Sequence, residues 1–163
     1  MKSLKDNNNI YLVPAFTGLG APYWDANARG VLSGITRDTS PKEIVRATIE
    51  AVAYQTYDLF EAMKHDGLRP KIVKVDGGMV MNNWFSQFLS DIVNVKVLRP
   101  KVQETTALRA AIMAGLQIGV YKSLKDISKN WQLDKKFSPK MQNPSRNKLL
   151  KGWSAAIKKT LSN

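Results

Sequence analysis

The sequence predicts an α/β fold in which short strands alternate with amphipathic helices. An apolar strand pattern at 72–75 is broken by two glycines and followed by apolar residues at helical spacing. A long helical pattern runs through 40–67, and a second strand pattern at 95–98 precedes another helical stretch. Strands that alternate with helices favour layers of helices packed on a sheet.

The first part of the chain contains two predicted strands and an aromatic loop. Residues 1–9 are polar and turn-like, and 10–16 has the pattern of a short strand ended by proline and glycine. A second strand is predicted at 30–36. Between them, Thr17–Asp25 is a glycine-rich loop with two large aromatic side chains. Such loops often carry functional groups, and the simpler interpretation is a lid packed on the core by Trp24.

The next element is a long helix that starts at Ser40-Pro41. Ser40 can cap the first turn, and proline suits the first helical position. Gly67 and Pro70 indicate its end. Apolar residues at spacings of three and four, or their sum, predict the face that packs on the core: Val45, Ile49, Val52, Leu59 and Met63.

The stretch 71–83 carries the clearest functional signal. Its order of strand, glycine turn and helix presents backbone N–H groups and the positive end of a helix to a ligand. Gly77 and Gly78 would let a phosphate or sugar approach the backbone closely. Asn82, near the helix start, has an amide that both donates and accepts, which suits a nucleobase edge. The alternative is an ordinary strand-to-helix turn with an asparagine cap.

The remaining chain predicts further helices and a loop. A helix is expected from Glu104 to about Tyr121, a short helix at 123–131, a polar loop at 132–143 and a final helix at 144–161. The first of these helices has a face of small residues that can lie close to a sheet or another helix: Ala107, Ala110, Ala111, Ala114 and Gly115.

The net charge of +12 is concentrated towards the C-terminus. Residues 1–121 carry 14 Lys+Arg and 11 Asp+Glu, whereas 122–163 carry 11 and 2. Lysine outnumbers arginine 18 to 7, while base recognition favours arginine and clustered aromatics, so nucleic acid is not a favoured partner. In the final helix lysines lie opposite the apolar residues, and we interpret it as a docked helix rather than a membrane-binding one.

The 163 residues fit one domain with a sizeable core. We divide it into a polar segment 1–9, an α/β part 10–121 and a basic helical tail 122–163. The sequence has no cysteine, which excludes disulfides and suits a reducing compartment, so a cytoplasmic location is expected. No apolar run approaches the roughly 18 residues of a membrane span, and the first residues lack a signal-peptide pattern.

Four motifs follow one another along the chain. Val13–Asp25 reads VPAFTGLGAPYWD, and Gly30–Ile35 is followed at a fixed distance by Glu43–Glu50. Val75–Asn83 holds the glycine pair and two asparagines, and Glu104–Gly115 is the small-faced helix. In this order they resemble the FGGY carbohydrate kinase family, including its adenosine motif at the glycine pair. The first motif is similar to the loop of the glycerol kinase branch.

The resemblance covers about residues 10–160 and implies a ribonuclease-H-like, actin-type ATPase fold with nucleotide bound between two domains. ATP or ADP with Mg²⁺ would be the cofactor, and the γ-phosphoryl group of ATP would pass to a primary hydroxyl of glycerol. Gly78 would contact the ADP phosphates or ribose through its backbone, and Asn82 would contact the adenine. Gly77 and Asp76 would shape the turn.

The resemblance also implies an incomplete C-terminal domain that lacks its first strands. The glycerol site and the catalytic aspartate belong to the family's N-terminal part, so we assign no catalytic residue and expect no activity from this chain alone. An unpaired strand edge and an exposed apolar face would make it aggregation-prone unless a complementing kinase fragment or a homo-oligomer covers them. Arg109 departs from the family, which usually has glycine there.

Two other interpretations stay open. The chain could belong to another FGGY sugar kinase, against which the loop at 22–25 argues, and a substrate screen on a reconstituted enzyme would decide. It could also be a basic interaction module that acts through residues 122–163. Salt-dependent binding to nucleic acid or anionic lipid, lost on deletion of that segment, would favour the module.

Overall fold

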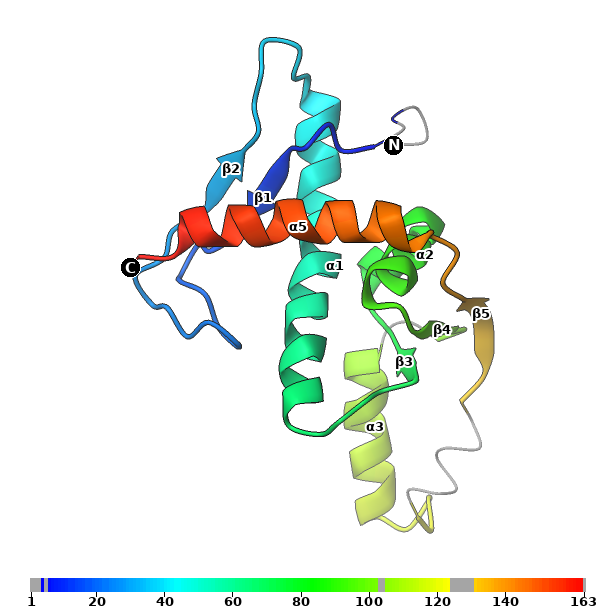
Figure 1. The fold of residues 1–163 in the computed structure, drawn as a ribbon. Coiled ribbons are helices and arrows are strands. Elements are labelled where there is room, and N and C mark those ends of the chain that lie inside the picture. The colour runs from blue at the N-terminus through cyan, green and yellow to red at the C-terminus, as the bar shows by residue number, and fades with distance from the viewer. Residues whose placement is uncertain (1–3, 5, 103–104, 124–130, 163) are drawn as a thin grey trace.

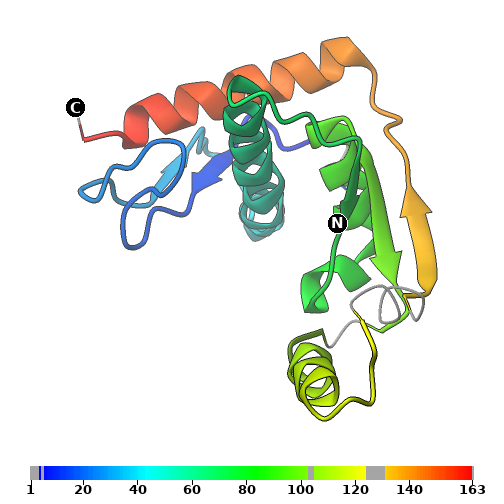
Figure 2. The same cartoon turned by 90° about the horizontal axis from the view of Figure 1, so that it is seen from below.

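The chain folds into mixed α/β layers with two sheets, as the alternation of patterns predicts. A computed structural model describes residues 4, 6–102, 105–123 and 131–162. One sheet has two strands and the other has three (Figure 1). The long helix α1 stands between the two sheets, and the C-terminal helix α5 lies across it (Figures 1 and 2).

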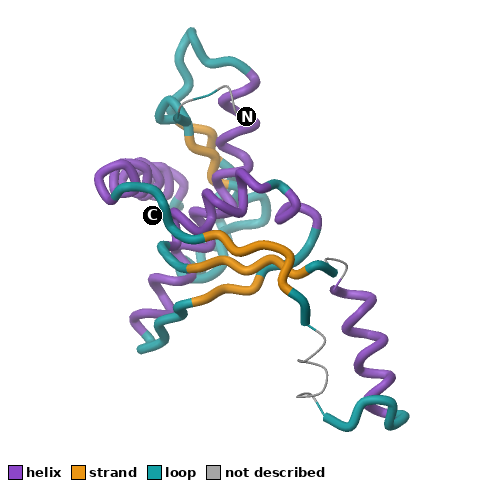
Figure 3. The backbone as a smooth tube through the Cα atoms, turned by 90° about the vertical axis from the view of Figure 1, so that its right-hand side faces the viewer, coloured by secondary structure: helices purple, strands orange, loops and turns teal. Residues whose placement is uncertain are grey.

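The strands are short and pair within their own sheet. In the first sheet β1 (Tyr11–Val13) is antiparallel to β2 (Val31–Ser33). In the second sheet β3 (Ile72–Lys74) is parallel to β4 (Lys96–Pro100), which is antiparallel to β5 (Leu133–Phe137). Figure 3 shows these three strands side by side, with β4 in the centre. The four strands predicted from the sequence are confirmed with shorter or shifted bounds.

The described helices are α1 (Pro41–His65), α2 (Asn83–Val93), α3 (Thr105–Gln117) and α5 (Asn143–Thr160), with a 3₁₀ turn, η1 (Gly78–Met81), before α2. The predicted helices over 40–67, 82–94 and 144–161 are therefore confirmed. The predicted short helix at 123–131 falls almost wholly outside the described residues. None of the helices in the described ranges is long and apolar enough to cross a membrane.

The start of α1 is fixed by a capping box. The Ser40 hydroxyl accepts a hydrogen bond from the Lys42 N–H at 3.3 Å, and the Ser40 N–H donates to the Glu43 carboxylate at 2.9 Å. This reciprocal arrangement satisfies two backbone donors that a helix start otherwise leaves free. The cap predicted at Ser40 is confirmed.

The predicted core face of α1 is confirmed in part. Ile49, Val52 and Met63 pack against the core, whereas Val45 is 53% exposed and Leu59 is 44% exposed. The buried residues of α1 are Phe60 and a set of small or hydrogen-bonded polar side chains: Glu43, Arg46, Ala47, Glu50, Ala51, Ala53, Tyr54 and Asp58. Buried polar residues that bond to one another can occupy a core face, which apolar spacing does not reveal.

The core centres on a group of aromatic rings where α1, α2, α5 and β1 meet. Tyr54 of α1 stacks on Trp153 of α5 at a centroid distance of 5.2 Å and meets Phe88 of α2 edge-on at 5.7 Å. The Trp153 indole N–H donates to the Asp58 carboxylate at 2.7 Å. The apolar face predicted for the final helix is thus the face that docks on the core.

Two loop interpretations need correction. The predicted polar loop at 132–143 contains strand β5, an edge strand of which only Phe137 is buried. Lysines on an edge strand commonly protect it against pairing with other chains. Here they interrupt the apolar pattern by which a strand is predicted from sequence. In the loop Thr17–Asp25, Trp24 is 78% exposed. Tyr23 instead packs on the core, so Trp24 is not the residue that holds this loop in place.

The small face of α3 is not covered in the described part of the chain. Ala110, Ala111 and Ala114 are exposed, and α3 stands apart from the other helices (Figures 1 and 2). Gly115 packs on the ring of Tyr121, which follows the same helix. The side chains of Ala107 and Arg109 lie outside the described residues. The close packing predicted for this face is therefore absent from the described structure.

Gly152 lets α5 approach β1, and its replacement by alanine is expected to destabilise the fold. A Cβ atom there would lie 2.2 Å from the Tyr11 hydroxyl oxygen. Overpacking of this kind typically costs about 1–3 kcal/mol in the free energy of unfolding. Urea unfolding measures it. In a Tyr11→Ala background the same substitution should cost much less, and equal costs in both backgrounds would contradict this explanation.

Candidate nucleotide-binding site

The glycine pair forms an open turn directly after β3. Gly77 has φ +90°, a conformation that side chains with a Cβ atom rarely adopt. Gly78 begins η1 with an ordinary φ and is exposed to solvent. A Cβ atom added at either position would meet no other atom within 4 Å. The protein itself therefore leaves the space over Gly78 free, as a ligand that approaches the backbone requires.

The segment that connects the two glycines to α2 differs from the predicted direct glycine turn. The 3₁₀ turn η1 lies between them, and α2 begins only at Asn83. The Asn82 side-chain oxygen accepts hydrogen bonds from the N–H groups of Trp84 at 3.0 Å and Phe85 at 3.3 Å. The first N–H groups of α2 are thus occupied by a cap, so the expectation that they face the turn as free donors was wrong.

The cap leaves Asn82 with one kind of hydrogen-bonding group for a ligand. Its oxygen serves α2, and among the described residues its Nδ2 group makes no hydrogen bond. The residue is exposed. Nδ2 can therefore donate to an acceptor nitrogen such as those on the edge of adenine. Gly77, Gly78 and Asn82 lie within one short turn, which the sequence spacing predicts.

Substitutions of Asn82 can separate its cap of α2 from the hydrogen bond that its Nδ2 group could donate to a ligand. We expect Asn82→Ala to lower the free energy of unfolding by about 1 kcal/mol because the cap of α2 is lost, whereas Asn82→Ser keeps a capping oxygen and stays within a few tenths. Both variants lack the amide donor. If Nδ2 binds the nucleobase, both should bind Mg-ADP more weakly by a similar factor in calorimetric titration. Weaker binding by the alanine variant alone would show that only the cap matters.

A buried arginine of β4 holds the end of the turn η1. Arg99 of β4 is 6% exposed, and its Nη1 donates to the carbonyl oxygens of Val80 at 2.7 Å and Met81 at 3.2 Å. Its Nε pairs with the Asp134 carboxylate of β5 at 2.7 Å. The Ser86 hydroxyl also donates to the Val80 carbonyl, at 2.8 Å. In the sequence, Arg99 stands between the apolar strand pattern at 95–98 and Pro100, so it marks only the end of a strand, and its partners are distant in the chain.

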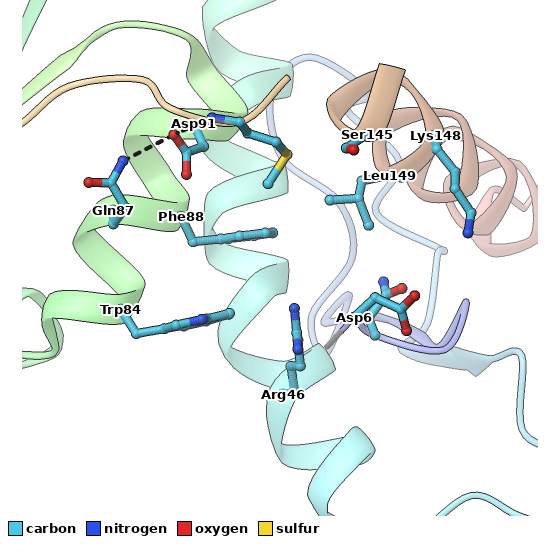
Figure 4. A pocket seen from close by; sticks show the side chains of 11 residues that line it. Asp6, Arg46, Trp84, Gln87, Phe88, Asp91, Ser145, Lys148 and Leu149 are labelled. Atoms are coloured by element: carbon cyan, nitrogen blue, oxygen red, sulfur yellow. Dashed lines mark hydrogen bonds between the residues drawn. The ribbon is translucent and has the colours of Figure 1, made fainter. Parts of the chain in front are cut away.

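A cavity of about 420 Å³ lies elsewhere, between α1, α2, α5 and the N-terminal segment. Figure 4 shows Trp84 and Phe88 projecting into it from α2, with Asp6, Arg46 and Lys148 around them. The two rings stack at 5.1 Å, and the Arg46 guanidinium lies 5.2 Å from the centre of the Trp84 ring. Neither glycine of the turn nor Asn82 lines this cavity.

Two charged residues that line the cavity, Arg46 and Asp91, are hydrogen-bonded to other groups of the protein. Arg46 Nε donates to Glu50 at 2.7 Å, and the Tyr54 hydroxyl donates to the other oxygen of Glu50 at 3.0 Å. Burial raises the pKa of Glu50, and the bond from Arg46 opposes this shift. Asp91 accepts from Gln87 and from the N–H groups of Lys140 and Met141. These contacts stabilise the fold around the cavity.

The mixed α/β layers of the chain correspond to part of an actin-like ATPase fold, as comparison with known structures shows. The chain has the fold of the FGGY kinases among known structures. Residues 1–118 match the C-terminal domain of the FGGY family of carbohydrate kinases. The chain belongs to this family.

Within this family, the chain is similar in sequence to glycerol kinases. Glycerol kinase 1 of Pseudomonas aeruginosa is 55% identical over 96% of the chain, and a glycerol kinase of Clostridium botulinum is 50% identical over 97%. Plasmodium falciparum glycerol kinase, solved with ADP, covers 99% of the chain with a TM-score of 0.84 at 35% identity. The chain spans 32% of the length of these bacterial relatives and 33% of the Plasmodium structure.

Proposed function

We propose that the chain is the nucleotide-binding C-terminal part of a glycerol kinase, which transfers the γ-phosphoryl group of ATP to glycerol and releases ADP and glycerol 3-phosphate. The observation that carries the proposal is the open turn at Gly77-Gly78, in a fold that aligns over 99% of the chain with a glycerol kinase solved with ADP. The sequence identity of 50–55% to bacterial glycerol kinases supports glycerol as the acceptor.

The turn residues have separate roles in this proposal. The backbone of Gly78 contacts the phosphates or ribose of ADP, because the space above it is free of protein atoms. Asn82 donates from Nδ2 to the adenine while its oxygen caps α2. Gly77 provides the positive φ that turns the chain from β3 into η1. The ligand is thereby held on backbone and amide groups rather than on charged side chains.

Phosphoryl transfer needs more groups than this proposal assigns to the chain. Such a reaction requires a positioned acceptor hydroxyl, a carboxylate near it and charge neutralisation at the phosphates, commonly by Mg²⁺. The described residues contain no group of three His, Asp or Glu that could hold a metal ion, so we assign no residue here to Mg²⁺. We propose that the rest of a full-length kinase supplies glycerol binding and the catalytic carboxylate, and that this chain alone does not phosphorylate glycerol.

The alternatives have less support. A sugar kinase is the alternative by fold, since a xylulose kinase of Lactobacillus acidophilus aligns with a TM-score of 0.73 at 29% identity. Residues 122–163 supply Phe137 and Trp153 to the core, which gives this basic segment a structural role without a polyanionic partner. A cytoplasmic location, and a complementing fragment or homo-oligomer, remain part of the proposal.

Calorimetric titration of the folded chain with Mg-ADP tests nucleotide binding directly. We expect saturable binding of one nucleotide per chain. Circular dichroism and a cooperative melting transition establish beforehand that the chain is folded. A folded chain that shows no heat of binding at millimolar Mg-ADP would contradict the proposal that this segment binds nucleotide without the remainder of the kinase.

A further inference from the structure

Arg99 pairs with Lys135 of β5 as part of strand β4, and its buried cationic side chain also reaches beyond the sheet. Its guanidinium contacts two carbonyl oxygens at the end of η1 and one carboxylate oxygen on β5, and it lies 5.5 Å from the centre of the Phe137 ring. These contacts connect β4, β5 and the end of the turn that carries Gly78. In this ion pair the Arg99 side chain is buried from solvent, whereas the Asp134 side chain is 38% exposed.

Burial of a guanidinium is costly unless its donors are bonded, so a purely structural position would favour an apolar side chain of similar volume. Arginine offers what an apolar residue cannot, since its planar fork of donors holds several acceptors in one fixed geometry. Here two of these acceptors are consecutive carbonyls, of Val80 and Met81. Fixing them orients the backbone on both sides of the last η1 residue, immediately before Asn82.

We infer that Arg99 is a positioning residue, which holds the Gly77–Asn82 turn in the geometry that receives the nucleotide, and that Asp134 orients Arg99. This inference rests on the proposed nucleotide site. Arg99 does not contact the nucleotide in this proposal. It acts through the backbone carbonyls of Val80 and Met81, to which it donates hydrogen bonds. Ser86, which also donates to the Val80 carbonyl, secures the same turn from the side of α2.

The test compares Arg99 with Arg146 of α5. Arg99 bonds to carbonyls just before α2 begins, and Arg146 bonds to a carbonyl near its end. Arg146 Nε donates to the Ile92 carbonyl at 2.8 Å, so Arg146→Met also removes a guanidinium–carbonyl bond, but far from the turn along the helix. We expect Arg99→Met to weaken Mg-ADP binding by at least about tenfold, since small displacements of a binding turn are costly. Arg146→Met should leave the affinity within about twofold while lowering the melting temperature.

Two further measurements separate positioning from general stability. Hydrogen exchange without nucleotide should speed up at residues 79–82 in Arg99→Met and not in Arg146→Met. Asp134→Asn, which keeps Arg99 in place but removes its partner charge, should weaken binding by an intermediate factor. If Arg99→Met does not fold, Arg99→Lys replaces it, because lysine retains the charge and one donor but not the fork.

The outcomes are distinct. If the wild-type chain is folded but binds no Mg-ADP, the proposal that this segment binds nucleotide by itself fails, and exchange at residues 79–82 still decides whether Arg99 fixes the turn. If the wild-type chain binds and the folded Arg99 variant binds equally well, the positioning role is overturned. Equal loss of affinity in the Arg99 and Arg146 variants would also overturn it, because the effect would then follow stability alone.

Discussion

Replacing Gly78 by valine is expected to weaken Mg-ADP binding by at least about a hundredfold, or about 2.7 kcal/mol. The side chain would fill the space over the turn that the protein leaves open, where no atom lies within 4 Å of an added Cβ. Gly78 has an ordinary φ and is exposed, so the substitution should leave the free energy of unfolding nearly unchanged. Calorimetric titration gives the affinity, and urea unfolding gives the stability.

Gly20 provides the matched control for this prediction. It is also exposed, has an ordinary φ and would place a Cβ in open space, but it lies in the loop Thr17–Asp25. Gly20→Val should therefore bind Mg-ADP as the wild type does. A Gly78→Val chain that is folded and retains wild-type affinity would show that nucleotide does not approach the backbone at Gly78.

Replacing Arg46 by methionine is expected to destabilise the fold by about 3–5 kcal/mol at neutral pH. Arg46 is the bonded partner of Glu50, which is completely buried, and it also donates from Nη1 to the Leu4 carbonyl at 2.6 Å. Without Arg46 the Glu50 carboxylate would remain buried with the Tyr54 hydroxyl as a donor but without a compensating charge. Chemical unfolding monitored by circular dichroism measures the loss.

The pH dependence of this loss identifies its cause. Burial already raises the pKa of Glu50, and removal of Arg46 would raise it further because the arginine favours the ionised form. A raised carboxyl pKa gives stability that is present at low pH and is lost as the pH rises through the folded-state pKa. The Arg46→Met defect should therefore be smaller at acidic pH than at neutral pH.

A second substitution serves as the control for Arg46. In Arg46→Met/Glu50→Gln, the buried residue carries no charge and can still accept a hydrogen bond from Tyr54, so part of the stability should return. If the double variant is as unstable at neutral pH as the sum of the single variants, the uncompensated charge is not the source of the loss.

Local signals predicted much of the fold. Ser40, Pro41 and Glu43 define the start of α1 through contacts within a few residues, and the glycine pair marks the turn after β3. Alternation of strand and helix patterns predicted the α/β class. The positions of Gly77, Gly78 and Asn82 in one turn follow from spacing alone, and the motifs around them indicated the family that the comparisons confirm.

The features that the sequence did not reveal depend on distant partners. Residue Arg99 is explained only by Val80, Met81 and Asp134, which reach it from other elements. The core face of α1 includes Glu50 because Arg46 and Tyr54 satisfy it, while the apolar spacing pointed to Val45 and Leu59. Strand β5 was hidden by its lysines. The free N–H groups expected at α2 were lost because Asn82 caps the helix.

The most direct test of the account is a chimera in which this chain replaces the matching third of Pseudomonas aeruginosa glycerol kinase 1. We predict ATP-dependent phosphorylation of glycerol, loss of this activity with Gly78→Val, and no preference for xylulose or gluconate over glycerol. A folded chimera that binds glycerol but does not phosphorylate it would contradict the claim that this chain is a working nucleotide-binding part of a glycerol kinase.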